Sequence, residues 1–140
     1  MSTSSTRRRP RQSPPRRSGK RPAAGVVVWE ARPRWRMARR GVIAFGPGKA
    51  DLLEAIAKHG SISAAAMALG MSYRRAWVLV ATMNASFARP LVRTSARRRA
   101  GASLTADGRA VLALYRRIEK RSLAATRRDL AELTSRLRPA

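Results

Sequence analysis

The chain has 140 residues and a formal net charge of +24, because 31 lysines and arginines accompany only 7 acidic residues. This length fits one domain with tails, and the charge predicts a polyanionic partner such as nucleic acid. The chain has no cysteine, one histidine and no apolar run near the roughly 18 residues of a membrane-spanning helix, so we expect a cytoplasmic protein without cofactor, metal site or membrane contact.

The first segment is rich in serine, arginine and proline, and has too few apolar side chains to offset the entropy of ordering. We therefore expect residues 1–33 to form a disordered basic tail. This tail either attracts phosphates without reading sequence or has no specific role. Within it, the apolar patch at residues 26–29 fits a short strand or a transient contact.

The next segment changes pattern, because apolar and basic residues alternate over residues 34–44. This alternation predicts one or two strands with one face on the core. A helix is then predicted over residues 48–59, with Lys49 on its polar face as a candidate phosphate contact. The Gly-Pro-Gly-Lys sequence at its start lacks the spacing of a nucleotide-binding loop. The predicted core face of this helix contains Leu52, Leu53, Ile56 and Ala57.

Residues 60–84 predict two helices joined by a tight turn. Ser61 or Ser63 can cap the first helix, Gly70 supplies a left-handed residue at its end, and Ser72 can cap the second. Alanines allow the close crossing of a helix-turn-helix, whose second helix lies in the DNA major groove. An ordinary helical hairpin is the alternative, but the basic composition favours DNA binding. The predicted buried positions are Ile62, Ala65, Ala66 and Leu69 in the first helix, and Ala76, Val80 and Met83 in the second.

The start of the second helix carries the residues that we expect to contact DNA. Tyr73, Arg74 and Arg75 are candidates for base edges or neighbouring phosphates, since an arginine can bond guanine with two hydrogen bonds. Ser72 is also a candidate phosphate donor. Trp77 fits either contact with DNA or packing within the protein.

Residues 91–95 and 102–104 predict the strands of a hairpin whose tip holds Arg97, Arg98 and Arg99. Beside a helix-turn-helix, such a tip predicts a wing that lies along the DNA backbone or enters the minor groove. A solvated charged loop is the alternative.

The last segment predicts a long helix capped by Thr105, with an apolar stripe that continues to residue 137. We expect residues 34–121 to form a DNA-binding domain and the helix at 105–137 to pair with a second copy. A homodimer would hold its two recognition helices about 34–36 Å apart. Fraying after residue 122 is the alternative. The predicted fold class is mainly α, a winged helix-turn-helix with a small β-hairpin wing and a long C-terminal helix.

The chain resembles the DNA-binding domain of the molybdenum-dependent transcriptional regulators, the ModE-like family, which is close in layout to LysR-type winged helix-turn-helix domains. The resemblance spans about residues 34–119. Its more specific part is Ser72-Tyr73, followed by Ala76-Trp77 and Met83-Asn84 at this spacing. Family members often have a glycine-rich wing, whereas this wing is rich in arginine.

The resemblance implies sequence-specific binding of double-stranded DNA and transcription control of the molybdate-uptake type. Members of the family continue into molybdate-binding domains, and we find no segment here that could form one. We therefore expect no molybdate binding by this chain alone. A nonspecific architectural DNA-binding protein is the alternative function. We do not expect an enzyme, because the sequence shows no paired-carboxylate, metal or nucleophile constellation.

Overall fold

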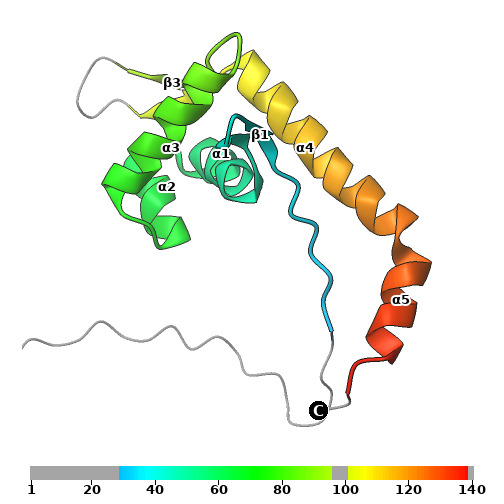
Figure 1. Cartoon of the computed structure of the whole chain (residues 1–140). Helices are drawn as coiled ribbons and strands as arrows, with labels where there is room; N and C mark the ends of the chain where they lie inside the picture. The colour runs from blue at the N-terminus through cyan, green and yellow to red at the C-terminus, as the bar shows by residue number, and fades with distance from the viewer. Residues whose placement is uncertain (1–28, 96–100, 139–140) are drawn as a thin grey trace, which may run out of the picture. The chain divides into compact units, whose positions relative to one another are not determined.

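The computed structural model describes residues 29–95 and 101–138, within which Trp29–Leu137 forms one compact unit (Figure 1). The hairpin of β1 and β2 precedes the helices, and a second antiparallel hairpin, β3 and β4, lies between α3 and α4 in the chain. The predicted tail lies outside the described residues except for residues 29–33. The elements are β1 (Met37–Arg39), β2 (Val42–Phe45), α1 (Pro47–His59), α2 (Ile62–Leu69), α3 (Tyr73–Ser86), β3 (Val92–Thr94), β4 (Ala102–Leu104), α4 (Ala106–Ala125) and α5 (Arg127–Ser135).

The core lies where α1, α2 and α3 pack together. Pro47 occupies the first turn of α1, where its missing N–H is no loss, and Gly60 ends the helix at φ 74°. Two predicted core positions are wrong, because Ala57 and Leu69 are exposed, whereas Ala55 is buried. The largest fully buried side chains are Leu52, Leu53, Ile56, Val80, Met83 and Leu91.

The first hairpin confirms the two strands that alternation predicted, but its expected core face is wrong. Arg40 and Gly41 turn the chain with positive φ angles of 51° and 79°. Val42 and Ile43 are exposed, and within the two strands only Phe45 is buried. The Phe45 ring meets the Tyr115 ring edge-on at a centroid distance of 5.2 Å, so the hairpin joins the core only at its end.

The C-terminal stretch forms two helices where one was predicted. Thr105 caps α4 as expected, since its side chain accepts a hydrogen bond from the Gly108 N–H. The helix then ends at Thr126, which has φ −101° and ψ 7°, and α5 follows. The long C-terminal helix is thus confirmed over residues 106–125, while its predicted continuity to residue 137 is wrong.

A cluster of charges fastens α4 to α1. Arg116 donates hydrogen bonds to Asp51 at 2.8 Å, to Glu54 at 3.2 Å and to Glu119 at 2.8 Å. Burial lowers the pKa of the Arg116 guanidinium, but the bonds to Asp51 and Glu119 outweigh it and raise that pKa above its ordinary value. We refer to Arg116 and these three carboxylates as the α1–α4 seam.

A hydrogen-bonded contact beside the seam joins α4 to the segment before β1. The buried Tyr115 hydroxyl donates to the Trp35 carbonyl at 2.9 Å, and the Trp35 indole N–H donates to the Ser122 hydroxyl at 2.7 Å. Burial raises the pKa of the Tyr115 phenol, so this group keeps its proton and remains a donor at neutral pH.

Candidate nucleic-acid interface

The turn between α2 and α3 is built by the residues that local sequence indicated. The Ser61 hydroxyl accepts from the Ala64 N–H at 3.0 Å, so Ser61 rather than Ser63 is the cap of α2. Gly70 has φ 68°, a left-handed conformation that redirects the chain with no Cβ clash. The Ser72 hydroxyl accepts from the Arg75 N–H at 3.1 Å and caps α3. These contacts confirm the helix-turn-helix.

The second helix of this pair, α3, has one buried face and one exposed face. Ala76, Val80 and Met83 are buried, as predicted, and hold α3 on the core. Because successive residues turn by about 100°, Arg74 and Val78 lie on the opposite side. The side chains of Tyr73, Arg74 and Arg75 are all exposed beside the capped N-terminus, so the site residues predicted in α3 lie together.

Trp77 lies at the edge of the exposed face. Its ring meets the Tyr73 ring edge-on at a centroid distance of 6.2 Å, and 39% of its surface is exposed. This aromatic pair steadies the first two turns of α3 and leaves part of each ring open to solvent. Trp77 therefore packs against Tyr73 and still exposes part of its ring to a partner outside the chain.

Charge is distributed unevenly along the chain. No acidic residue occurs between Glu54 and Asp107, a stretch that includes α2, α3 and both strands of the second hairpin. Within residues 29–95 and 101–138, the arginines in ion pairs are Arg32, Arg89, Arg116 and Arg136. The guanidinium groups of Arg74 and Arg75 therefore have no carboxylate partner there, and can meet an anion from outside.

Asn84, which the sequence indicated only as part of the family resemblance, fixes α3 to the second hairpin. The Asn84 side chain accepts from the N–H groups of Leu91 and Val92 at 2.9 and 3.1 Å, and donates to the Val92 carbonyl at 3.1 Å. Such an amide satisfies three backbone groups at the start of β3. The available signal for this role was an uncharged polar side chain next to the buried Met83, near the end of the helix.

The second hairpin is held against the end of α1 by a close backbone approach at the start of β4. The Ala102 N–H donates to the Gly60 carbonyl at 2.8 Å, and a Cβ on Gly101 would lie only 2.0 Å from that same oxygen. Glycine is needed at this position for a steric reason. The strands confirm the predicted hairpin, while the arginines of its tip, Arg97, Arg98 and Arg99, lie outside the described residues.

Lys49 does not have the predicted surface position. Its side chain is buried at 7% exposure, and its ammonium group donates a hydrogen bond to the Ile43 carbonyl. Burial lowers the pKa of Lys49. Lys49 is thus a structural link between α1 and β2, and it is not placed to bind phosphate.

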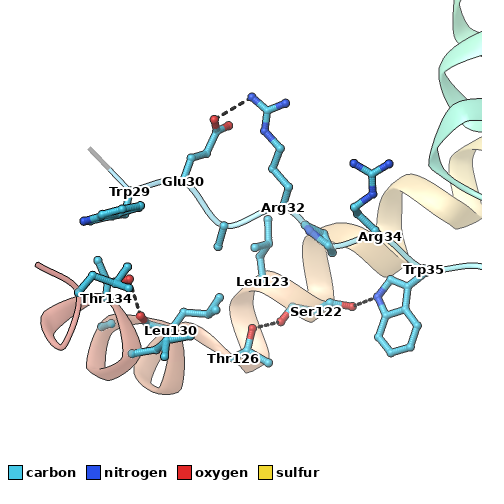
Figure 2. Close-up of a pocket in the computed structure, with 15 residues that line it drawn as sticks. Trp29, Glu30, Arg32, Arg34, Trp35, Ser122, Leu123, Thr126, Leu130 and Thr134 are labelled. Atoms are coloured by element: carbon cyan, nitrogen blue, oxygen red, sulfur yellow. Dashed lines mark hydrogen bonds and ion pairs between the residues drawn. The ribbon is translucent and has the colours of Figure 1, made fainter. Parts of the chain in front are cut away.

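A groove of about 720 Å³ lies away from the helix-turn-helix, between the segment at residues 29–35 and helices α4 and α5 (Figure 2). Trp29, Leu123 and Leu130 contribute apolar walls, and none of the lining residues comes from α2, α3 or the second hairpin. Its one carboxylate, Glu30, is paired with Arg32 at 2.7 Å. This groove has no arrangement of groups for acid–base catalysis.

Across residues 29–95 and 101–138, no three His, Asp or Glu side chains gather as a metal ion would require. In the same ranges, no helix has the length and apolar character needed to cross a bilayer.

Comparisons with known proteins agree with this geometry. Residues 49–109 match the family described as "Bacterial regulatory helix-turn-helix protein, lysR family". The molybdenum-pterin-binding protein MopA of Rhodobacter capsulatus is 41% identical over 83 residues, which cover 58% of this chain and 31% of that protein. The molybdenum transport protein ModE of Azotobacter vinelandii is 44% identical over 70 residues, covering 49% of this chain and 26% of that protein.

The chain thus spans less than a third of the length of these two curated relatives. Among solved structures, the DNA complex of the CbnR DNA-binding domain is similar with a TM-score of 0.49 and 28% identity. That match covers 64% of this chain and 97% of the CbnR chain. The resemblance to the ModE-like DNA-binding domain is confirmed by the two curated relatives and by the lysR-family match.

Proposed function

We propose that this chain is a sequence-specific DNA-binding transcriptional regulator. Its residues 49–109 match the lysR family of helix-turn-helix regulators, and its similarity to MopA and ModE places this domain with the ModE-like type. The observation that carries the proposal is the exposed, capped start of α3, where Arg74 and Arg75 have no carboxylate partner within residues 29–95 and 101–138. A helix N-terminus favours phosphate, and exposed arginines there can reach guanine edges.

In this proposal α3 is the recognition helix and lies in the major groove of double-stranded DNA. Tyr73, Arg74 and Arg75 contact base edges or adjacent phosphates, Ser72 caps the helix and donates to phosphate, and Trp77 contacts the groove wall. The second hairpin is the wing, with Arg97, Arg98 and Arg99 on the backbone or in the minor groove.

We further propose that the regulator acts as a homodimer in the cytoplasm. Leucines of the C-terminal stretch are exposed and are not covered by the residues that the structure describes. Pairing with a second copy would bury them, and removal of apolar surface from water is favourable. The exposed leucines are Leu114 and Leu123 in α4, Leu133 in α5, and Leu137 after the end of α5.

The names of the relatives point to molybdenum, so we propose genes of molybdenum handling as targets. Molybdate binding by this chain is not part of the proposal, because the shared region is a DNA-binding domain. Calorimetric titration with molybdate tests this point, and stoichiometric binding would contradict it.

The regulator proposal is tested with a site selected from a random duplex library. Affinity for that site and for a scrambled duplex is measured at several salt concentrations. We expect Arg75→Ala to reduce the ratio of the two affinities by about 5- to 150-fold, the loss of one base contact. Arg128→Ala, an exposed arginine in α5, is the matched control and should leave the ratio unchanged.

Two results would count against this assignment. If wild type binds the selected and scrambled duplexes equally, the chain is a nonspecific architectural protein. If Arg75→Ala weakens both duplexes equally and lowers the salt slope, Arg75 contacts phosphate only.

A further inference from the structure

The exposed face of α3 has a feature that charge does not explain. Val78 has 58% of its surface exposed, and it is neither in the hydrophobic core nor packed against it. An exposed valine in a helix brings no packing energy and has lower helix propensity than alanine or a long straight side chain. Single exposed apolar side chains are common on protein surfaces, so exposure alone assigns no role to Val78, and its place on the helix carries the argument.

The position of Val78 on the helix is central to the exposed face. Ala76, Val80 and Met83 define the buried side, and Val78 lies nearly opposite them at 100° per residue. Arg74 is four residues earlier, so the two side chains are neighbours one turn apart. Val78 thus follows Arg74 along the surface that the proposed function places in the major groove.

The chemistry of this side chain limits what it can read. Valine neither donates nor accepts a hydrogen bond, so it cannot recognise the polar edges of guanine, cytosine or adenine. In the major groove the one apolar group on a base edge is the C5-methyl of thymine. The branched side chain has few rotamers, so it presents its methyl groups in a nearly fixed direction.

We infer that Val78 reads a thymine methyl group, and that the preferred DNA site has a thymine close to the base contacted by Arg74. This inference rests on the proposed function, because it requires α3 to be the recognition helix. It adds a base identity, and it assigns part of the specificity to an apolar contact that tolerates salt better than the arginine contacts.

The test replaces each thymine of the selected site, one at a time, by deoxyuridine, which lacks only the methyl group. For wild type we expect at least one replacement to weaken binding about three- to ten-fold, the effect of one buried methyl. For Val78→Ala the intact site should bind more weakly, and the same replacement should have no further effect.

Val42→Ala is the matched control, because Val42 in β2 is also a valine and is 57% exposed. This variant should respond to deoxyuridine as wild type does. Thermal unfolding of both variants checks that neither substitution disturbs the fold.

The possible failures are distinguishable. If wild type selects a site but no deoxyuridine replacement changes its affinity, or if Val78→Ala keeps the full loss, the thymine inference is wrong and the regulator proposal stands. If wild type selects no site at all, the proposed function is wrong and this inference fails with it.

Discussion

The exposed face of α3 and the α1–α4 seam place arginine side chains in opposite surroundings. On α3, Arg74 and Arg75 extend into solvent without a carboxylate partner in the described ranges. In the seam, Arg116 is surrounded by three carboxylates and only 32% of its side chain is exposed. The placement of a few acids thus separates arginines available for binding from an arginine that holds the fold together.

This difference shows where acidic residues reduce the repulsion between positive charges and where they do not. A net charge of +24 opposes compaction through self-repulsion. Placing Asp51, Glu54 and Glu119 around one arginine relieves repulsion where α1 and α4 meet. The acid-free stretch from residue 55 to 106 keeps its positive potential for a polyanion. Variants that affect one region and spare the other test this separation.

The largest expected effect is at a close backbone contact outside these two regions, where α4 begins against the residue before β3. A Cβ on Gly108 would lie 2.1 Å from the Leu91 carbonyl oxygen, which is backbone and cannot rotate away. We expect Gly108→Ala to lower the free energy of unfolding by about 3 kcal/mol, because backbone must shift. Urea denaturation measures this, and DNA binding should fall with the folded fraction.

Gly48→Ala is the control for this substitution. Gly48 is also helical, but a Cβ there would meet nothing within 4 Å. Alanine should leave stability unchanged or raise it by up to about 1 kcal/mol through its better helix propensity. Equal destabilisation by the two variants would show that the close approach at Gly108 is unimportant.

The seam itself gives a smaller effect on stability and none on recognition. We expect Arg116→Ala to lower the free energy of unfolding by about 1–2 kcal/mol, since its partners Asp51 and Glu54 are more than half exposed and each pair contributes little. The folded variant should keep the wild-type ratio of affinities for selected and scrambled duplexes.

Arg117→Ala serves as the comparison on the same helix. Arg117 is exposed, and no ion pair within the described ranges includes it. Its removal should change stability by less than about 0.5 kcal/mol. If Arg116→Ala loses sequence preference and Arg117→Ala does not, the seam influences DNA binding by the exposed face of α3.

The smallest expected effect concerns Lys49. Because its ammonium group bonds the Ile43 carbonyl inside the protein, we expect Lys49→Met to change DNA affinity by less than about twofold. Stability should change by about 1 kcal/mol or less, since a lost hydrogen bond is offset by removal of a poorly solvated charge. A large loss of DNA affinity with an unchanged fold would show that Lys49 contributes to DNA binding.

The pH dependence of this variant has a definite sign. Burial lowers the pKa of Lys49 in the folded state, so the unfolded chain binds the proton more tightly. The free energy of unfolding of the wild type should therefore increase as pH rises from the lowered pKa of folded Lys49 toward the ordinary value of 10.5. The difference between wild-type and Lys49→Met unfolding curves over this range should show that gain.

The sequence was most informative where structure depends on near neighbours. Capping bonds connect residues three apart, so Ser72 and Thr105 could be identified as helix starts from residue type and spacing. Gly70 was predictable because few other residues adopt its left-handed conformation. Residue type and spacing along the chain likewise predicted helices α2 and α3, the second hairpin and the candidate site on α3.

The burial and the partners of several side chains depend on contacts between distant segments, which local sequence patterns do not reveal. The internal position of Lys49 depends on β2, whose Ile43 carbonyl accepts its hydrogen bond, and the role of Asn84 depends on β3 returning to the end of α3. The apolar stripe of the C-terminal stretch did not reveal the break at Thr126. By itself the sequence determined the helix-turn-helix and its charge. Contacts between distant segments decided which charged side chains face solvent, because burial is set by what packs from elsewhere in the chain.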